Sequence, residues 1–212
     1  MRQNNKVLVI GLTGTIASGK STVSRYLKRM YHAVHIDADL VAREVVQSEA
    51  VSLSEVFGPE ILTEDGIVDR KALGRIVFQN PEALETLNRM VHPATVQRIA
   101  DDIEKIRKRK TNQDSSDSFK GSQIVVVEAI ELLRSGLKDI VDTIWVVYAD
   151  PKIRQLRMMN ERNISEQDAA DRISSQWDDE TYRAHADQII KSTGGDVKLL
   201  YDQVDDAFER CL

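Results

Sequence analysis

The chain has 212 residues, a length that suits one sizeable core or a core with a subdomain. Hydrophobic residues make up 42% and charged residues 30%, the balance of an ordinary globular protein rather than a disordered one. The formal net charge of −5 argues against nucleic acid as a partner, because nucleic-acid binders present a basic face. No stretch approaches the roughly 20 apolar residues of a membrane helix, and the single cysteine, Cys211, cannot form an internal disulfide. We expect a soluble, cytoplasmic protein.

The N-terminal segment predicts a strand, a helix and a second strand. Residues 6–12 form a continuous apolar run, which is typical of a strand buried on both faces. The period then changes: Val23, Leu27 and Met30 are spaced by four and three residues, which places one apolar stripe on a helix. Residues 33–37 predict a short second strand. This order of elements indicates a parallel sheet.

The next eighty residues have the pattern of helices. Asp69 is a candidate N-cap for one helix, and Asn80, followed by a proline, opens another. Pro93 is expected to begin a further helix with its own apolar stripe. We therefore predict a helical insert over residues 40–122.

The C-terminal part returns to strands that alternate with helices. Strands are predicted over residues 124–129, 142–149 and 186–191. Helix starts are predicted at Pro151, Ser165 and Asp196. The prediction is an α/β fold, a three-layer domain with a five-stranded parallel sheet, built from residues 1–39 and 123–212.

The turn between the first strand and the first helix carries the pattern G-x-x-x-x-G-K-S, from Gly14 to Ser21. A P-loop requires this context, because small residues let backbone N–H groups surround a phosphate chain at a helix N-terminus. Lys20 would reach the β- and γ-phosphates, and the Ser21 hydroxyl would bind Mg²⁺. A structural glycine turn with a surface lysine is the alternative. The residues predicted to bind the nucleotide here are Gly14, Thr15, Ile16, Ala17, Ser18, Gly19, Lys20, Ser21 and Thr22.

The signatures of two other classes of P-loop protein are missing from the sequence. A GTPase would show N-K-x-D and D-x-x-G, and a transport ATPase would show L-S-G-G-Q; none of these occurs. A P-loop, an insert able to bind an acceptor and an arginine-rich segment near the end favour a small-molecule kinase.

Three segments resemble the dephospho-coenzyme A kinase family: "IGLTGTIASGKSTVSRYL", "HIDADLVAREVV" and "FGPEILTEDGIVDRKALGRIVFQNPEALETLNRMVHP". The tail "ADQIIKSTGG" extends the resemblance over nearly the whole chain. This family transfers the γ-phosphoryl group of ATP to the ribose 3′-hydroxyl of dephospho-CoA, the last step of coenzyme A synthesis. The resemblance therefore implies ATP and dephospho-CoA as substrates and Mg²⁺ as the metal.

The resemblance also implies roles for residues in and after the second strand. Asp39 matches the acid that accepts the proton of the acceptor hydroxyl, with Asp37 as its rival, and either could instead be an N-cap. The carboxyl end of a strand in an open parallel sheet is where ligands bind, which suits Asp39. Asp37, Asp39 and His92 are expected to contact the acceptor, and the insert is its binding domain. His92 could also simply mark a helix boundary.

Residues 152–177 resemble a lid over ATP. Arg162 is the first candidate in it for contact with phosphates and Arg157 the second, with an exposed, solvated arginine as the alternative. Three positions depart from the family pattern. Residues 130–134 replace Pro-Leu-Leu-Phe-Glu, Met158 replaces an arginine, and Ser192 or Thr193 replaces an asparagine. The rival functions are a nucleoside or nucleotide kinase of the same fold and a non-catalytic ATP-sensing module.

Overall fold

The computed structural model describes residues 7–111, 123–162 and 164–211, apart from the side chains of 109–111 and 162. Contacts divide the chain into two compact units, which are described separately. One unit comprises Met1–Ile36 and Ile106–Leu212, and the other comprises Asp37–Lys105. The helical insert predicted over residues 40–122 overlaps the second unit, and its last eleven residues, 112–122, lie outside the described part.

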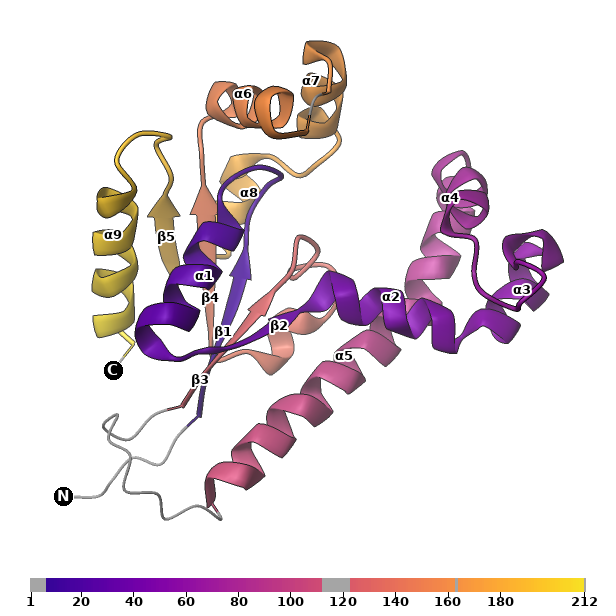
Figure 1. Ribbon diagram of the computed structural model, residues 1–212, viewed down its shortest axis with the longest axis horizontal. Helices are drawn as coiled ribbons and strands as arrows, with labels where there is room; N and C mark the ends of the chain where they lie inside the picture. Colours follow the sequence, from indigo (N-terminus) through magenta and orange to yellow (C-terminus); the bar gives the residue numbers. More distant parts are fainter. Residues whose placement is uncertain (1–6, 112–122, 163, 212) are drawn as a thin grey trace. The chain divides into compact units, whose positions relative to one another are not determined.

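The first unit is built on a five-stranded sheet, as predicted (Figure 1). Its strands are β1 (Val7–Thr13), β2 (Val34–Asp37), β3 (Gln123–Glu128), β4 (Thr143–Tyr148) and β5 (Gln188–Lys191). The strand order is β2-β3-β1-β4-β5, and β1 pairs in parallel with β3 and β4. Leu12 on β1 is in register with Glu128 on β3 and with Trp145 on β4. The carboxyl ends of these three strands therefore meet at one edge of the sheet.

Helices of the first unit follow the strands. They are α1 (Lys20–Tyr31), α6 (Pro151–Arg162), α7 (Glu166–Ser174), α8 (Asp179–Ala184) and α9 (Val197–Glu209), with a 3₁₀ turn at Leu137–Ile140. Helices α1 and α9 share one core with the strands, in which Leu27 and Val204 are fully buried. The predicted place of Met30 in this core is wrong: Met30 is 47% exposed. Tyr26 takes the position against α9 instead, where its ring stacks on Tyr201 at 4.0 Å.

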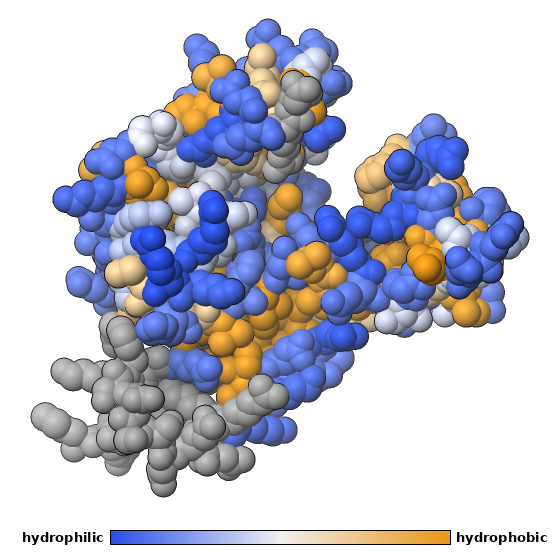
Figure 2. All heavy atoms as spheres, in the orientation of Figure 1, coloured by the Kyte–Doolittle hydropathy of each residue, from blue (hydrophilic) through white to orange (hydrophobic). Residues whose placement is uncertain are grey.

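The second unit is helical. It contains α2 (Ala38–Ser48), α3 (Ala50–Phe57), a 3₁₀ turn (Pro59–Ile61), α4 (Arg70–Phe78) and most of α5 (Pro81–Thr111). The predicted caps are confirmed: the Asp69 side chain accepts two N–H groups of α4, and the Asn80 side chain accepts two of α5. A small core lies between these helices, with Leu53 and Ile61 fully buried. In the space-filling view, orange hydrophobic side chains reach the surface of this unit among blue hydrophilic ones (Figure 2).

The predicted helix boundary at Pro93 is wrong, because α5 continues through it. A proline inside a helix loses its own hydrogen bond and strains the preceding turn, at a cost of about 3 kcal/mol. Burial on both sides offsets this cost, since Val91 is 5% and Ile99 0% exposed. The Thr95 hydroxyl also donates to the Val91 carbonyl at 2.8 Å, within the same turn. Among the helices that the structure describes, none is long and apolar enough to cross a membrane.

Candidate active site

The P-loop of the first unit is a compact turn between β1 and α1 that depends on its glycines. Gly14 has a φ of +141°, and a Cβ atom there would lie 2.2 Å from the Val147 carbonyl oxygen of β4. Gly19, the N-cap of α1, has a φ of +104°. Side chains rarely adopt this region, so the turn requires glycine at both positions. Ala17, at φ 58°, adopts the left-handed conformation without being a glycine.

Lys20 is the first residue of α1, and its ammonium group lies inside the loop. Its side chain is buried, and Nζ donates to the carbonyl oxygens of Gly14 at 2.8 Å and Thr15 at 3.1 Å. A buried cation at the positive end of a helix is an anion-binding arrangement. The loop therefore has the backbone and the charge to hold a phosphate chain.

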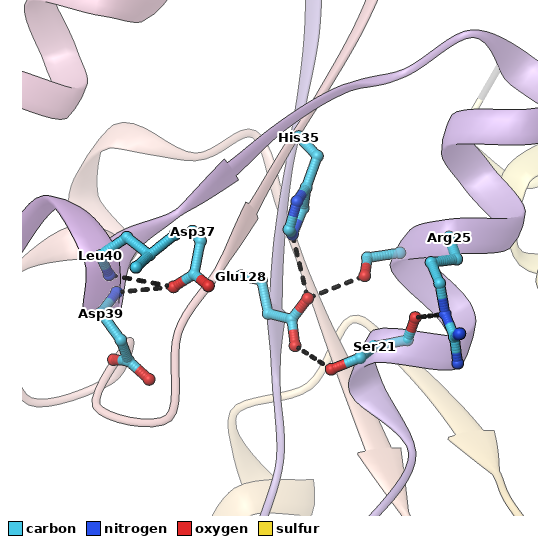
Figure 3. Close-up of polar contacts among 8 residues, drawn as sticks. Ser21, Arg25, His35, Asp37, Asp39, Leu40 and Glu128 are labelled. Atoms are coloured by element: carbon cyan, nitrogen blue, oxygen red, sulfur yellow. Dashed lines mark hydrogen bonds and ion pairs between the residues drawn. The ribbon is translucent and has the colours of Figure 1, made fainter.

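Glu128 ends β3 beside the P-loop and gathers three side chains (Figure 3). The Ser21 hydroxyl donates to Oε1 at 3.1 Å, the Ser24 hydroxyl donates to Oε2 at 2.8 Å, and His35 Nε2 lies 3.0 Å from Oε2. Burial raises the pKa of the Glu128 carboxyl, but the hydrogen bonds from His35, Ser24 and Ser21 outweigh burial and hold the pKa below its usual value. Glu128 is therefore an anion at neutral pH.

This carboxylate and the Ser21 hydroxyl form an oxygen donor set of the kind that Mg²⁺ prefers when phosphates supply the remaining ligands. Within the described residues no group of three or more His, Cys, Asp and Glu side chains could hold a metal alone. Sequence reasoning missed Glu128 because it reads as the end of an apolar strand. The available signal was its charge at the carboxyl end of a strand otherwise buried throughout.

The chain that follows β4 contacts the P-loop at several points. Gln176 lies between α7 and α8, and its side-chain oxygen accepts a hydrogen bond from the Ile16 N–H at 2.7 Å. The Thr15 hydroxyl lies 3.5 Å from Asp179, which accepts a hydrogen bond from Arg154 at 2.9 Å. Helix α8, which carries Asp179, was not predicted.

Of the arginines predicted in the lid, Arg157 contacts the loop directly. Its guanidinium donates to two loop carbonyl oxygens, at 3.0 and 3.1 Å, and to the Ser192 hydroxyl at 2.8 Å. Met158, where the family pattern has an arginine, is fully buried instead. The side chain of Arg162 lies outside the described residues. Met158, the second departure from the family pattern, directly follows Arg157 in the chain. Ser192, one of the two residues considered for the third departure, accepts a hydrogen bond from the Arg157 guanidinium.

The first departure, residues 130–134, has partners within the first unit. The Arg134 guanidinium lies 4.0 Å from the centre of the Trp177 ring and 3.8 Å from the Glu131 carboxylate. The Ile130 carbonyl accepts from the Thr13 hydroxyl at 3.2 Å. The residues that replace the family's Pro-Leu-Leu-Phe-Glu therefore hold this loop to β1 and to the segment before α8.

In the second unit, the two aspartates of the I-D-A-D segment differ in their contacts. Asp37 is the N-cap of α2: its Oδ1 atom accepts the N–H groups of Asp39 at 3.0 Å and Leu40 at 3.1 Å (Figure 3). The N-cap alternative thus applies to Asp37. Asp39 lies in the first turn of α2 with an exposed side chain, and His92 is partly buried within α5, one residue before Pro93.

Comparison with known proteins identifies the family. The family model for dephospho-CoA kinase matches residues 8–197. A dephospho-CoA kinase from Bacillus anthracis is 40% identical over 190 residues, which cover 88% of this chain and 89% of the relative. The crystal structure of the protein TT1252 from Thermus thermophilus has a TM-score of 0.78 at 26% identity and covers 97% of this chain and 98% of its own. A dephospho-CoA kinase structure from Campylobacter jejuni has a TM-score of 0.69 at 25% identity and covers 96% of both chains. The chain belongs to the dephospho-CoA kinase family.

Proposed function

We propose that the protein transfers the γ-phosphoryl group of ATP to the ribose 3′-hydroxyl of dephospho-CoA, with Mg²⁺ as the metal. The observation that carries the proposal is a P-loop closed around the buried ammonium group of Lys20, in a chain of the dephospho-CoA kinase family. Phosphoryl transfer asks a protein mainly to position its reactants and to neutralise charge. The residues of the first unit have the chemistry for both tasks.

Lys20 and the loop amides would bind the triphosphate. The hydrogen bonds of Nζ to Gly14 and Thr15 already hold the ammonium group inside the loop, so a phosphate can replace these carbonyls without moving the cation far. As the phosphoryl group leaves, charge builds on its oxygens, and a fixed cation stabilises that charge without reorganisation.

Ser21 and Glu128 would hold Mg²⁺. The metal, when bound with ATP, neutralises phosphate charge. Because the Ser21 hydroxyl donates its proton to Glu128, its lone pairs are left for a cation. Ser24 and His35 hold the other carboxylate oxygen in place, and such outer partners fix the orientation of a metal ligand.

Asp39 would orient the acceptor hydroxyl and take its proton. The resemblance assigns this role to the second acid of I-D-A-D, and the contacts of Asp37 support the choice. An oxygen that accepts two backbone N–H groups of a helix is engaged in capping, whereas Asp39 presents an exposed carboxylate on the first turn of α2. A positioned carboxylate is a general base of the kind used by kinases.

An acceptor panel tests the proposal. Purified protein is incubated with Mg-ATP and, separately, dephospho-CoA, adenosine and nucleoside monophosphates, and products are identified by mass spectrometry. We expect phosphorylated product from dephospho-CoA alone, with the new phosphate on the ribose 3′-oxygen. Faster turnover of a nucleoside or nucleotide would replace the proposed acceptor with that compound. ATP binding without transfer to any acceptor would favour the sensing module.

A further inference from the structure

Arg157, on α6, holds the P-loop by its backbone. Its Nη1 atom donates to the carbonyl oxygens of Ala17 at 3.0 Å and Ser18 at 3.1 Å. Its Nη2 atom donates to the Ser192 hydroxyl at 2.8 Å. Ser192 is buried directly after β5, where its N–H continues the strand pairing by donating to the Tyr148 carbonyl at 2.7 Å. The guanidinium is therefore fixed on one side by the sheet and holds the loop on the other.

These carbonyl contacts determine where the loop amides point. In a trans peptide, the C=O of one residue and the N–H of the next point in opposite directions, and every described peptide bond is trans. A guanidinium bound to the oxygens of Ala17 and Ser18 thus directs the N–H groups of Ser18 and Gly19 away from itself. The Ser18 N–H accordingly donates into the loop, to the Thr15 carbonyl at 3.2 Å.

The loop backbone needs such support at this point. Ala17 has a φ of 58°, a conformation that persists in a residue with a side chain only where surrounding contacts impose it. Gly19 is equally adapted to the contact. A Cβ atom there would lie 3.1 Å from Ser192 Oγ and 3.4 Å from Arg157 Nη1, so the absence of a side chain lets both groups approach.

We propose that Arg157 and Ser192 are a positioning pair that sets the amides of the P-loop for the triphosphate of ATP. The inference rests on the proposed function, because it takes this loop as the ATP site. Arg157 acts through the peptide planes at residues 17–19, and Ser192 acts by holding the Arg157 side chain. The pair therefore serves the phosphate chain and is independent of the adenine base.

Two ligands separate this role from a contact with the base. Affinities for ATP and for inorganic tripolyphosphate, each with Mg²⁺, are measured by calorimetry. We expect Arg157→Met to weaken both by about tenfold, the effect of roughly one hydrogen bond to a charged group. Arg157→Lys should also weaken the binding of ATP and of tripolyphosphate, by the same factor for each ligand. An ammonium group lacks the planar fork of the guanidinium, which reaches two carbonyl oxygens and a hydroxyl together. Lys28→Met, which removes an exposed cation from the last turn of α1, is the control and should bind as the wild type does.

Ser192→Ala deletes one oxygen and tests the pair directly. It should weaken both ligands by about threefold, and in combination with Arg157→Met it should add nothing, since coupled residues are not additive. Amide hydrogen exchange of Ser18 and Gly19 in the ligand-free protein should be faster in both single variants. Thermal denaturation verifies folding; if Arg157→Met does not fold, Ser192→Ala carries the test alone.

Several results would overturn the inference. They are a loss of ATP affinity with unchanged tripolyphosphate affinity, wild-type behaviour of Arg157→Lys, additive effects in the double variant, or unchanged amide exchange at Ser18 and Gly19. Measurements on the wild-type protein distinguish failure of this inference from failure of the proposed function. A wild-type protein that binds tripolyphosphate but does not phosphorylate dephospho-CoA would contradict the proposed function and leave the pair intact.

Discussion

Replacing Glu128 with glutamine removes one negative charge from the oxygen donor set beside the P-loop and keeps its shape. In the wild type, Oε1 accepts the Ser21 hydroxyl, and Oε2 accepts Ser24 and lies against His35. The glutamine oxygen can keep the Oε2 contacts, which places its NH₂ group near the Ser21 hydroxyl. That group is a donor, so the Ser21 oxygen must accept from it and uses a lone pair that the metal needs. The fold is preserved and the metal site is not.

The expected loss is the range found when partners of a metal site are removed, about 10–100-fold in Mg²⁺ affinity or roughly 1.4–2.8 kcal/mol. Turnover is measured against free Mg²⁺ at saturating ATP, and ATP binding is measured by calorimetry with Mg²⁺ or with EDTA. The free Mg²⁺ concentration that gives half-maximal turnover should rise by about 10–100-fold. Metal-free ATP binding should be unchanged or tighter, because a carboxylate near the phosphates repels them.

The control is Glu209→Gln, which removes an exposed carboxylate from α9. It should show the Mg²⁺ dependence of the wild type. The reasoning is refuted if Glu128→Gln also shows that dependence. An equal loss of ATP binding with and without Mg²⁺ would be a structural defect in the loop and would likewise contradict a metal role.

Three further changes test other parts of the molecule. Lys20→Met should lower kcat by about 10²–10³-fold, the usual loss on removal of one electrostatic donor, and near-normal turnover in a steady-state assay would exclude the loop as the ATP site. Asp39→Asn should lower kcat by about 10²–10⁴-fold with ATP affinity maintained, whereas Asp37→Asn should remain active because asparagine is an equally good N-cap; the opposite result would exchange their roles. Burial is the largest cause and the hydrogen bond to Asp205 the second cause of the raised pKa of Tyr26, about 12. The neutral phenol therefore stabilises the fold fully at a pH below the unfolded pKa of tyrosine, about 10. This stabilisation is lost as the pH rises from that value through the pKa of the folded protein. Ultraviolet titration should show Asp205→Asn lowering that pKa, and an unshifted titration would contradict the assignment.

Local features of the chain were predictable from the sequence. The P-loop motif predicted the turn and the start of α1, and the caps at Asp69, Asn80 and Asp196 were confirmed because each depends on neighbouring residues alone. The prediction at Pro93 failed for the converse reason. A proline predicts a boundary when only its own hydrogen bond is considered, but burial of residues before and after it keeps α5 continuous.

The partners of the P-loop were not predictable in this way, because they come from 107 to 164 residues away in the chain. Strand order accounts for them. β1 lies between β3 and β4, and all three strands are parallel, so whatever follows β3 or β4 begins at the edge of the sheet where the P-loop lies. Nothing in the sequence states which strands flank β1.

The same strand order explains why the contacts of Glu128 and Arg157 with the loop region differ in kind. Glu128 is the last residue of β3, so the backbone of a regular strand fixes its carboxylate beside Ser21 and Ser24. Arg157 comes six residues after Pro151, on a helix joined to β4 by a short turn, and reaches the loop with a long side chain that Ser192 must restrain. The shorter Glu128 side chain, attached to the end of a strand, has less conformational freedom that a partner must restrain. A charged residue at the end of a strand next to a P-loop can therefore be identified once the strand order is known. The contact from the helix can be identified only when the position of the Ser192 hydroxyl, directly after β5, is also known.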